Sequence, residues 1–269
     1  MNAWMVLPYW KYELIFGACY MGKLKAFGIH VGISSALFLL LLFFIIVYWY
    51  PVPYFSADGG WQGIRLIFLV DVVLGPLLTL LVYKRGKPGL KFDMTLIALA
   101  QVVALSWGTW TVYSQRTMAV VFVDDAFHTL SPQQLEQAGL DESDLAQFPH
   151  DPPMVFLRLP EDEQERKKLV REYELKKNTP VIRLGERYEP LNATHMQTIM
   201  SRVNIIDDLR FYNPDFDAVV TRLLKKYGGT LDNYVLVPIH ARYRHSVMLI
   251  RRDDGRVLTM SELTIPSFY

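Results

Sequence analysis

The chain has 269 residues, a net charge of +1 and a positive mean hydropathy of +0.15. A charge so close to zero argues against a nucleic-acid binder, which carries a basic excess on one face. The lone cysteine, Cys19, excludes a disulfide framework and any metal site built from several cysteines. Apolar residues crowd into the part before Tyr113, and most charged residues follow it. This step in composition separates a lipid-solvated region from a water-solvated one.

Residues 1–25 form an N-terminal segment that we place in the cytoplasm. The first 20 residues are rich in aromatic side chains and lack the long apolar core of a signal peptide. Glu13 interrupts the apolar run ahead of Cys19, which argues against a lipoprotein cleavage site. Because Met21 opens a more natural start for a membrane protein, we expect residues 1–20 to be dispensable.

Three segments are long and apolar enough to be transmembrane helices, since a span needs about 20 mostly apolar residues. They cover residues 26–50, 64–83 and 92–113. The first span ends in Tyr48, Trp49 and Tyr50, whose rings are typical of the lipid–water boundary. The sequence therefore predicts a membrane α-helical region of three spans, embedded in a lipid bilayer.

Positive charge is distributed unevenly over the flanks and loops of these spans. The loop 84–91 holds four cations in eight residues, and Lys23 and Lys25 precede the first span. The loop 51–63 contains no lysine or arginine. Because basic flanks stay in the cytoplasm, we expect a cytoplasmic N-terminus and a periplasmic loop 51–63. Three crossings of the inner membrane then deliver residues 114–269 to the periplasm.

Asp71 lies in the second predicted span, where an unpaired carboxylate costs about 2.5–3.5 kcal/mol at mid-helix. Of the candidate partners in the chain, Arg65 is on another helix face and His30 is at another depth, which leaves Gln101 as the best donor. Three interpretations stay open. Asp71 fixes helix packing through an interhelical hydrogen bond, or it docks a partner's transmembrane helix, or it belongs to a proton or ion pathway.

Gly75 and Pro76 follow one helical turn after Asp71. Proline lacks the amide proton of a helical hydrogen bond, so Pro76 frees the carbonyl of Val72 and kinks the helix. Glycine lets a second helix approach closely. The pair therefore predicts a notch that an incoming helix could fill, although such residues are also common in ordinary membrane helices.

The region 114–269 predicts a soluble α+β domain that ends in an antiparallel hairpin. Apolar runs indicate strands, and capping residues and amphipathic spacing indicate helices. Strands are expected at 119–123, 154–159, 180–184, 234–239, 246–251 and from Val257 after the turn at Asp254 and Gly255. Helices are expected at 131–139, 161–177 and 215–227.

This domain shows no catalytic or cofactor motif. Phosphate-cradling glycine loops, nucleophile elbows and HExxH are missing from the sequence. The five-residue spacing of His240 and His245 suits neither a helical metal pair nor two residues on one strand face. The acidic pairs at 124–125 and 207–208 have ordinary explanations, because neighbouring strand residues point to opposite faces and acids favour helix starts. We therefore expect no enzyme, no cofactor and no metal.

Four linked stretches carry a family resemblance. They are KAFGIH at 25–30, DGGWQGIRL at 58–66, VDVVLGPLLTL at 70–80 and KPGLKFD at 87–93, with Gln101 in the span that follows. In this order they resemble the type IV pilin accessory proteins of the TfpX/TfpZ kind. The resemblance covers about residues 22–125, and beyond residue 125 it is one of general character.

The resemblance implies a bacterial inner-membrane protein that binds or chaperones a type IV pilin, the major pilin subunit, and assists its assembly into pili. A pilin waiting in the membrane on one hydrophobic helix could be held by the spans and by the periplasmic domain together. The candidate partner-binding residues are Asp71, Gly75, Pro76, Gln101, Asp58, Trp61 and Arg65.

The stretch 58–65 has two interpretations. Asp58 belongs to a turn and Trp61 anchors the chain at the lipid–water interface, or these residues contact the pilin directly. The alternative function is an envelope enzyme that modifies pilin or a lipid-linked substrate. A third hypothesis is a sensor with an input domain in the periplasm, but the short cytoplasmic tail and eight-residue loop leave no room for an output module and argue against it. The sequence does not determine the oligomeric state.

Overall fold

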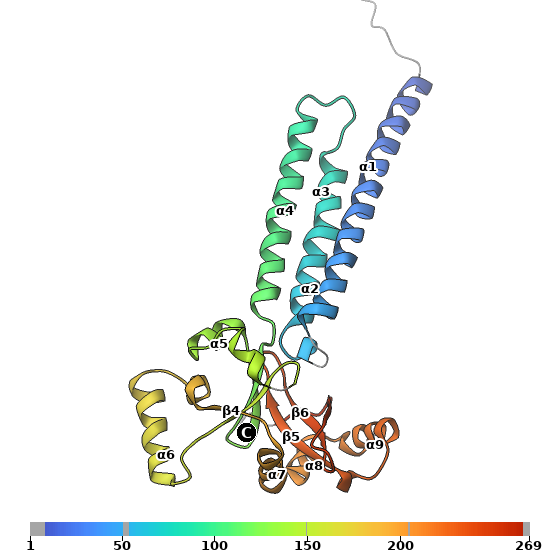
Figure 1. Cartoon of the computed structure of the whole chain (residues 1–269). Helices are drawn as coiled ribbons and strands as arrows, with labels where there is room; N and C mark the ends of the chain where they lie inside the picture. Colours follow the sequence, from blue (N-terminus) through green and yellow to red (C-terminus); the bar gives the residue numbers. More distant parts are fainter. Residues whose placement is uncertain (1–8, 51–53, 149, 204, 266–269) are drawn as a thin grey trace, which may run out of the picture. The chain divides into compact units, whose positions relative to one another are not determined.

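The computed structural model describes residues 9–50, 54–148, 150–203 and 205–265, with side chains from Gly22 onward (Figure 1). The chain divides into two compact units. The helical unit comprises the residues up to Ile45 together with Trp61–Val112, and the sheet unit comprises Ile46–Gly60 together with Tyr113–Tyr269. We expect residues 1–20 to be dispensable, and residues 1–8 of that segment lie outside the described residues.

The helical unit contains helices from three stretches of the chain. They are α1 (Tyr9–Phe44), which continues into the π-helix η1 (Ile45–Trp49); α2 (Gly60–Phe68), the π-helix η3 (Leu69–Leu74) and α3 (Gly75–Val82); and α4 (Leu90–Ser114). Within them, Gly22–Trp49, Gly60–Val82 and Leu90–Ser114 are long and apolar enough to cross a membrane. The prediction of three such helices is confirmed. The second begins at Gly60, four residues earlier than the sequence indicated.

Glycines set the approach of α4 to the second helix. A Cβ on Gly63 would lie 2.3 Å from the Val112 side chain, and a Cβ on Gly108 would lie 2.9 Å from Ile67. A glycine on one helix thus faces a branched side chain on the other at two successive levels, so the backbones come close without a clash. The second helix contacts α1 on one side and α4 on the other (Figure 1).

The sheet unit is built on one mixed sheet of seven strands within the described residues, in the order β4-β3-β1-β2-β5-β6-β7. The strands are β1 (Ala119–Val123), β2 (Ala126–Leu130), β3 (Met154–Leu157), β4 (Tyr188–Pro190), β5 (Tyr234–His240), β6 (His245–Arg251) and β7 (Val257–Met260). The pairs β1/β3 and β2/β5 are parallel and the others antiparallel. The mixed α+β character of this region is confirmed.

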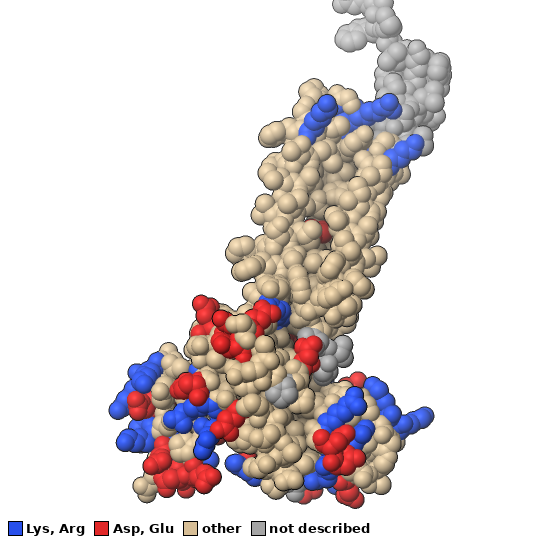
Figure 2. All heavy atoms as spheres, viewed as in Figure 1, with Lys and Arg blue, Asp and Glu red and all other residues tan. Residues whose placement is uncertain are grey.

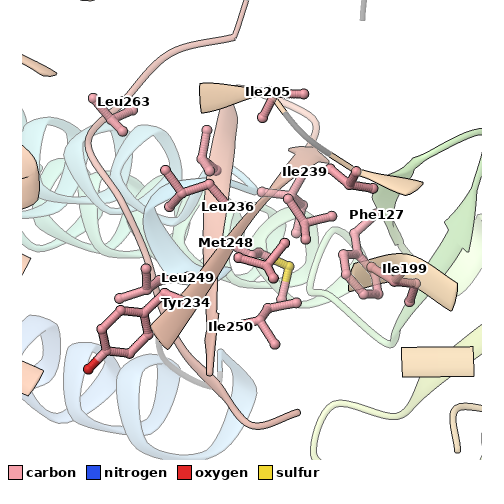
Figure 3. Packing of buried hydrophobic residues seen from close by; sticks show 14 of the residues in the cluster. Phe127, Ile199, Ile205, Tyr234, Leu236, Ile239, Met248, Leu249, Ile250 and Leu263 are labelled. Carbon is pink, nitrogen blue, oxygen red and sulfur yellow. The ribbon is translucent and has the colours of Figure 1, made fainter. Parts of the chain in front are cut away.

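Both faces of the central strands are covered, which explains why β1 is apolar at every position. Val120 and Phe122 point into one cluster, and Ala119, Val121 and Val123 point into the other. The first cluster packs α7 (Ala193–Arg202), α8 (Ile206–Tyr212) and α9 (Phe216–Tyr227) against β5 and β6. Figure 3 shows Ile199 of α7 beside Phe127 of β2, with Ile239 of β5 and Met248 of β6 in the same cluster. The second cluster lies under α5 (Pro132–Gln137) and α6 (Glu163–Val170).

The stretch between the first and second helices belongs to the sheet unit. The short 3-10 helix η2 (Tyr54–Ser56) puts the Tyr54 ring, 3% exposed, into the first cluster. The Tyr243 backbone N–H donates to the Ala57 carbonyl at 3.0 Å. Part of the predicted loop 51–63 is therefore packed in the core of a domain whose strands begin more than 60 residues later.

Several sequence expectations are confirmed in the sheet unit. Ser131 and Gln134 form the predicted capping box of α5, and Pro132 stands in its first turn. The helix α9 stops at Gly228, where φ is +82°. The predicted helix 161–177 is α6 followed by the π-helix η5 (Arg171–Lys176).

Other expectations in the sheet unit are wrong. Residues 181–183 form a 3-10 helix, η6 (Val181–Arg183), where a strand was expected. Asp124 and Asp125 are the two central residues of the β1–β2 turn, with φ of +49° and +63°, and not strand residues. Such a turn with two left-handed residues joins antiparallel strands directly. The strands β6 and β7 pair antiparallel, but the expectation that the domain ends in this hairpin is not confirmed, because the chain continues beyond β7 and Leu263 packs into the first cluster.

Candidate functional site

Asp71 is buried in the middle of the second helix. Its side chain is 6% exposed, and it stands eleven residues from each end of Gly60–Val82, about 17 Å along the axis. The sequence placed it nearer one end because the predicted span began at residue 64. Gln101 is likewise central in α4. On the face drawn in Figure 2, the helical unit is almost free of charged side chains between its ends and shows one small acidic spot midway.

The backbone around Asp71 is a π-helix, and this changes which carbonyl Pro76 leaves free. In η3 the Gly75 N–H bonds to the carbonyl five residues back, that of Val70. In the same pattern the residue opposite Pro76 is Asp71, in place of the Val72 that an α-helix predicts. Pro76 has no N–H to give. Gln101 Nε2 donates to the Asp71 carbonyl oxygen at 3.2 Å and replaces that bond.

Gly75 makes room for this replacement. A Cβ at Gly75 would lie 1.9 Å from Gln101 Nε2. Asp71, Gly75, Pro76 and Gln101, which the sequence singled out as candidates, thus form one local arrangement. The predicted pairing of Gln101 with Asp71 is wrong in one respect, because the amide binds the main-chain oxygen and not the carboxylate.

The Asp71 carboxylate is left unsatisfied. Within the described residues neither Oδ1 nor Oδ2 has a hydrogen-bond partner. A neighbouring polar pair is already joined, since His30 Nδ1 lies 2.6 Å from Thr79 Oγ1. Buried polar groups are nearly always hydrogen-bonded in native proteins, so an exception calls for a physical reason.

Asp71 lines two grooves of the helical unit. One, of about 680 Å³, runs between α1 and α4. Its walls include Ala26 and Ser34 from α1 and Ala98 and Leu105 from α4. The other, of about 580 Å³, lies between the second helix and α4. The first groove joins small side chains, apolar walls and one unpaired carboxylate, which suits a helix more than a solvated ligand.

Asp58 occupies the opposite kind of site, in the sheet unit. Its side chain is 3% exposed. Its carboxylate accepts hydrogen bonds from the Thr117 hydroxyl, from Thr129 Oγ1 at 2.8 Å and from the Arg242 backbone N–H at 3.0 Å. These donors come from the approach to β1, from β2 and from the β5–β6 connection. Asp58 therefore ties the chain before the second helix to the sheet.

Gly59 supports that connection. Its φ of +91° is a conformation that favours glycine, and a Cβ would lie 2.3 Å from the Tyr243 ring. The sequence predicted a turn here, and the turn ends at Gly60. Trp61 and Arg65 lie on α2 with exposed side chains, so they are helical residues and not part of the turn.

Three histidines form a row that sequence spacing did not reveal. His128 pairs in register with His240 across β2 and β5, and His240 with His245 across β5 and β6. The His128 and His240 rings stack at 4.7 Å, and the Nδ1 atoms of His240 and His245 are 3.1 Å apart. The prediction from spacing was wrong because it took both histidines to lie on one helix or one strand. His240 and His245 lie on the two strands of a hairpin, and they pair directly across it although they are five residues apart in the chain.

Two members of this row, His128 and His240, line a polar pocket of about 270 Å³ together with Arg183 and Asp58. Burial, with smaller contributions from His240 and His245, lowers the pKa of His128 to about 4. Burial and His245 lower the pKa of His240 as well. Both imidazoles are therefore neutral at pH 7. In the described parts of the chain, no group of three or more His, Cys, Asp or Glu side chains, this row included, is arranged so that it could hold a metal ion.

Three helices of membrane-spanning length and composition, with a mixed-sheet unit attached, define a membrane protein with a folded non-membrane domain. The chain is 37% identical over 110 residues to the "Fimbrial assembly protein, serogroups C1 and C2" of Dichelobacter nodosus, covering 40% of this chain and 83% of that protein. The chain belongs to this family of fimbrial assembly proteins.

The serogroup I protein of the same organism is 35% identical over 131 residues, and the serogroup E1 protein is 34% identical over 131 residues. The chain spans 51% of the length of each, and each match covers 47% of this chain. No family model matches the chain, and no solved structure matches it significantly.

Proposed function

We propose that this protein is an inner-membrane accessory protein of the TfpX/TfpZ kind, which binds a type IV pilin subunit and assists its assembly into pili. Two findings support the proposal. The relatives are named fimbrial assembly proteins, and the helical unit holds an open apolar groove beside an unpaired buried carboxylate. The groove is the observation that carries the binding role.

The proposed orientation puts the N-terminus in the cytoplasm and the sheet unit in the periplasm. The stretch 54–60 and the strands from β1 onward belong to one folded unit, so they need to lie on the same side of the membrane, as three crossings require. The loop 84–91, with exposed Lys84, Arg85, Lys87 and Lys91, lies at the opposite ends of its helices and favours the cytoplasm. A reporter fused after Tyr269 is expected to work only in the periplasm. Activity only in the cytosol would contradict the orientation.

In this function the two units hold two parts of one subunit. The helical unit binds the hydrophobic helix of the pilin in the groove, and the sheet unit faces the pilin domain outside the membrane. Since the first contact tethers the subunit, the second forms at a raised effective concentration. The two weak contacts together keep the subunit ready for the growing pilus.

The test is capture of the cognate pilin by the tagged full-length protein in detergent, paired with pilus counts in a deletion strain. We expect pilin to co-purify and surface pili to fall in the deletion strain. Complementation by the wild-type gene restores them. Normal pilus numbers without the protein, together with no capture, would refute the proposed function.

We propose that the protein acts by binding and not by catalysis. The competing role is an envelope enzyme that modifies pilin or a lipid-linked substrate. The intact mass of pilin from wild-type and deletion strains separates the two. An equal mass supports the binding role, and a mass difference favours a modifying enzyme.

A further inference from the structure

We propose that the occupant of the groove between α1 and α4 is a transmembrane helix that carries a hydrogen-bond donor opposite Asp71. This rests on the proposed function and deepens it, because it states what the bound helix needs to present.

The carboxylate requires a donor from outside the described chain. Asp71 is more than nine-tenths buried, and both its oxygens lack a hydrogen-bond partner within the described residues. The two polar side chains nearby do not supply it in this structure. Gln101 Nε2 donates to the Asp71 main-chain oxygen, His30 Nδ1 lies 2.6 Å from Thr79 Oγ1, and neither side chain hydrogen-bonds the carboxylate.

The groove is shaped for a helix that brings such a donor. Residues of one α1 face, Ala26 and Ser34 among them, oppose residues of one α4 face that includes Ala98. Small side chains on facing helices let another backbone approach closely, and polar side chains then bond across the interface. Asp71 lies midway along its helix, so the donor belongs near the middle of the partner's span.

Two other occupants fit less well. A lipid chain fills apolar space but donates no hydrogen bond. A second copy that used the same groove about a two-fold axis would bring one Asp71 toward the other, which adds repulsion in place of a donor. A different protein with a hydroxyl, amide or cationic side chain at mid-span meets both requirements. If the partner is the pilin of the proposed function, its helix has to present such a side chain opposite Asp71.

The experiment measures pilin captured by full-length protein in detergent for Asp71→Leu and Asp71→Asn. Leucine and asparagine are close to aspartate in size, and asparagine keeps one acceptor oxygen. We expect capture to fall about tenfold for Asp71→Leu, since an interhelical hydrogen bond in a membrane is worth about 1–2 kcal/mol. The amount of pilin captured by Asp71→Asn is expected to lie between the amounts captured by Asp71→Leu and by the wild type. Equal capture by Asp71→Leu and the wild type would overturn the inference.

A matched pair of tryptophan variants tests the groove itself. Ala98→Trp fills the groove, whereas Ala36→Trp places the same ring on an exposed position of α1 outside it. We expect Ala98→Trp to lose capture and Ala36→Trp to keep it. Equal losses from both would overturn the groove as the binding site. Monodisperse elution of each variant controls for folding.

The outcomes separate this inference from the proposed function. If Ala98→Trp abolishes capture while Asp71→Leu retains it, the donor is refuted and the pilin-binding function stands. If the wild type captures no pilin and the deletion strain keeps normal pilus numbers, the proposed function fails, and this inference fails with it. An Asp71-dependent dimer formed without pilin would overturn the inference in favour of a second copy.

Discussion

The two units each bury one carboxylate, and they treat it in opposite ways. In the sheet unit Asp58 is 3% exposed and accepts three hydrogen bonds from three segments. In the helical unit Asp71 is 6% exposed, and within the described residues its carboxylate accepts none. Burial alone therefore does not distinguish the two carboxylates. Their hydrogen bonds do, because Asp58 is satisfied within the sheet unit and Asp71 is left for the partner that we propose.

The difference follows from what each site has to do. Asp58 joins a stretch before the second helix to strands that come more than 55 residues later, so its bonds hold the sheet unit together. Near Asp71, the hydrogen bond from Gln101 satisfies the main-chain carbonyl, and the carboxylate has no partner within the described residues. An unsatisfied group in a low-dielectric site is costly, and such groups persist where function requires them.

Asp58→Ala is expected to cause the largest loss of stability. It leaves two threonine hydroxyls and the Arg242 N–H without their acceptor, at a cost of about 3–5 kcal/mol in the free energy of unfolding. Hydrogen exchange of the full-length protein measures this as faster exchange of the β1, β2 and β5 amides. Asp58→Asn keeps one acceptor oxygen and is expected to lose less. Unchanged exchange in Asp58→Ala would break the comparison.

The histidine row predicts that acid destabilises the sheet unit. The folded pKa of His128, about 4, lies below its unfolded value of about 6.5. Neutral His128 therefore costs the folded state nothing above pH 6.5. As the pH falls from 6.5 toward 4, the unfolded chain binds a proton that the folded chain does not, and the free energy of unfolding falls by at most about 1.4 kcal/mol per pH unit. Exchange of the β2 and β5 amides between pH 7 and pH 4.5, corrected for intrinsic rates, measures it.

His128→Gln is expected to flatten that dependence. His150 is exposed, so His150→Gln serves as the matched control and is expected to leave the slope unchanged. An equal slope in His128→Gln and the wild type would assign the acid sensitivity to other groups.

Gly75→Ala tests the helical side of the comparison and has a smaller expected effect. The added Cβ displaces the end of the Gln101 side chain, so the loss is one hydrogen bond to the Asp71 carbonyl, about 1 kcal/mol. Gln101→Ala is expected to cost as much alone. In Gly75→Ala with Gln101→Ala the second change adds little, because the bond is already gone. Thermal unfolding in detergent compares the four proteins, and additive losses would contradict the contact.

The sequence predicted the helical unit well because a bilayer imposes one simple rule on every residue of a span. The sheet unit was harder. The strand β2 was missed because its turn, Asp124 and Asp125, has no glycine and its middle residue is His128. The run 180–184 was mistaken for a strand because a short apolar run also suits the buried 3-10 helix η6.

The candidate site was predicted as a set of residues but not as a set of bonds. Asp71, Gly75, Pro76 and Gln101 were singled out together, yet the π-helix moved the free carbonyl from Val72 to Asp71. Local helix type is a tertiary outcome that spacing does not reveal. The role of Asp58 was out of reach for the same reason, since its donor at Arg242 is 184 residues away.

Asp71→Leu gives the smallest expected change in stability and the sharpest contrast with Asp58→Ala. Replacing an unpartnered buried carboxylate by an apolar side chain of similar size removes no hydrogen bond, and the Gln101 bond to the main chain of residue 71 remains. Replacing even paired buried charges by apolar groups is often neutral or stabilising. We therefore expect a loss below about 0.5 kcal/mol, or a gain, in thermal unfolding of the full-length protein in detergent. A loss as large as that of Asp58→Ala would show that residue 71 holds the helices together, and its missing partner would then have to lie within the chain itself.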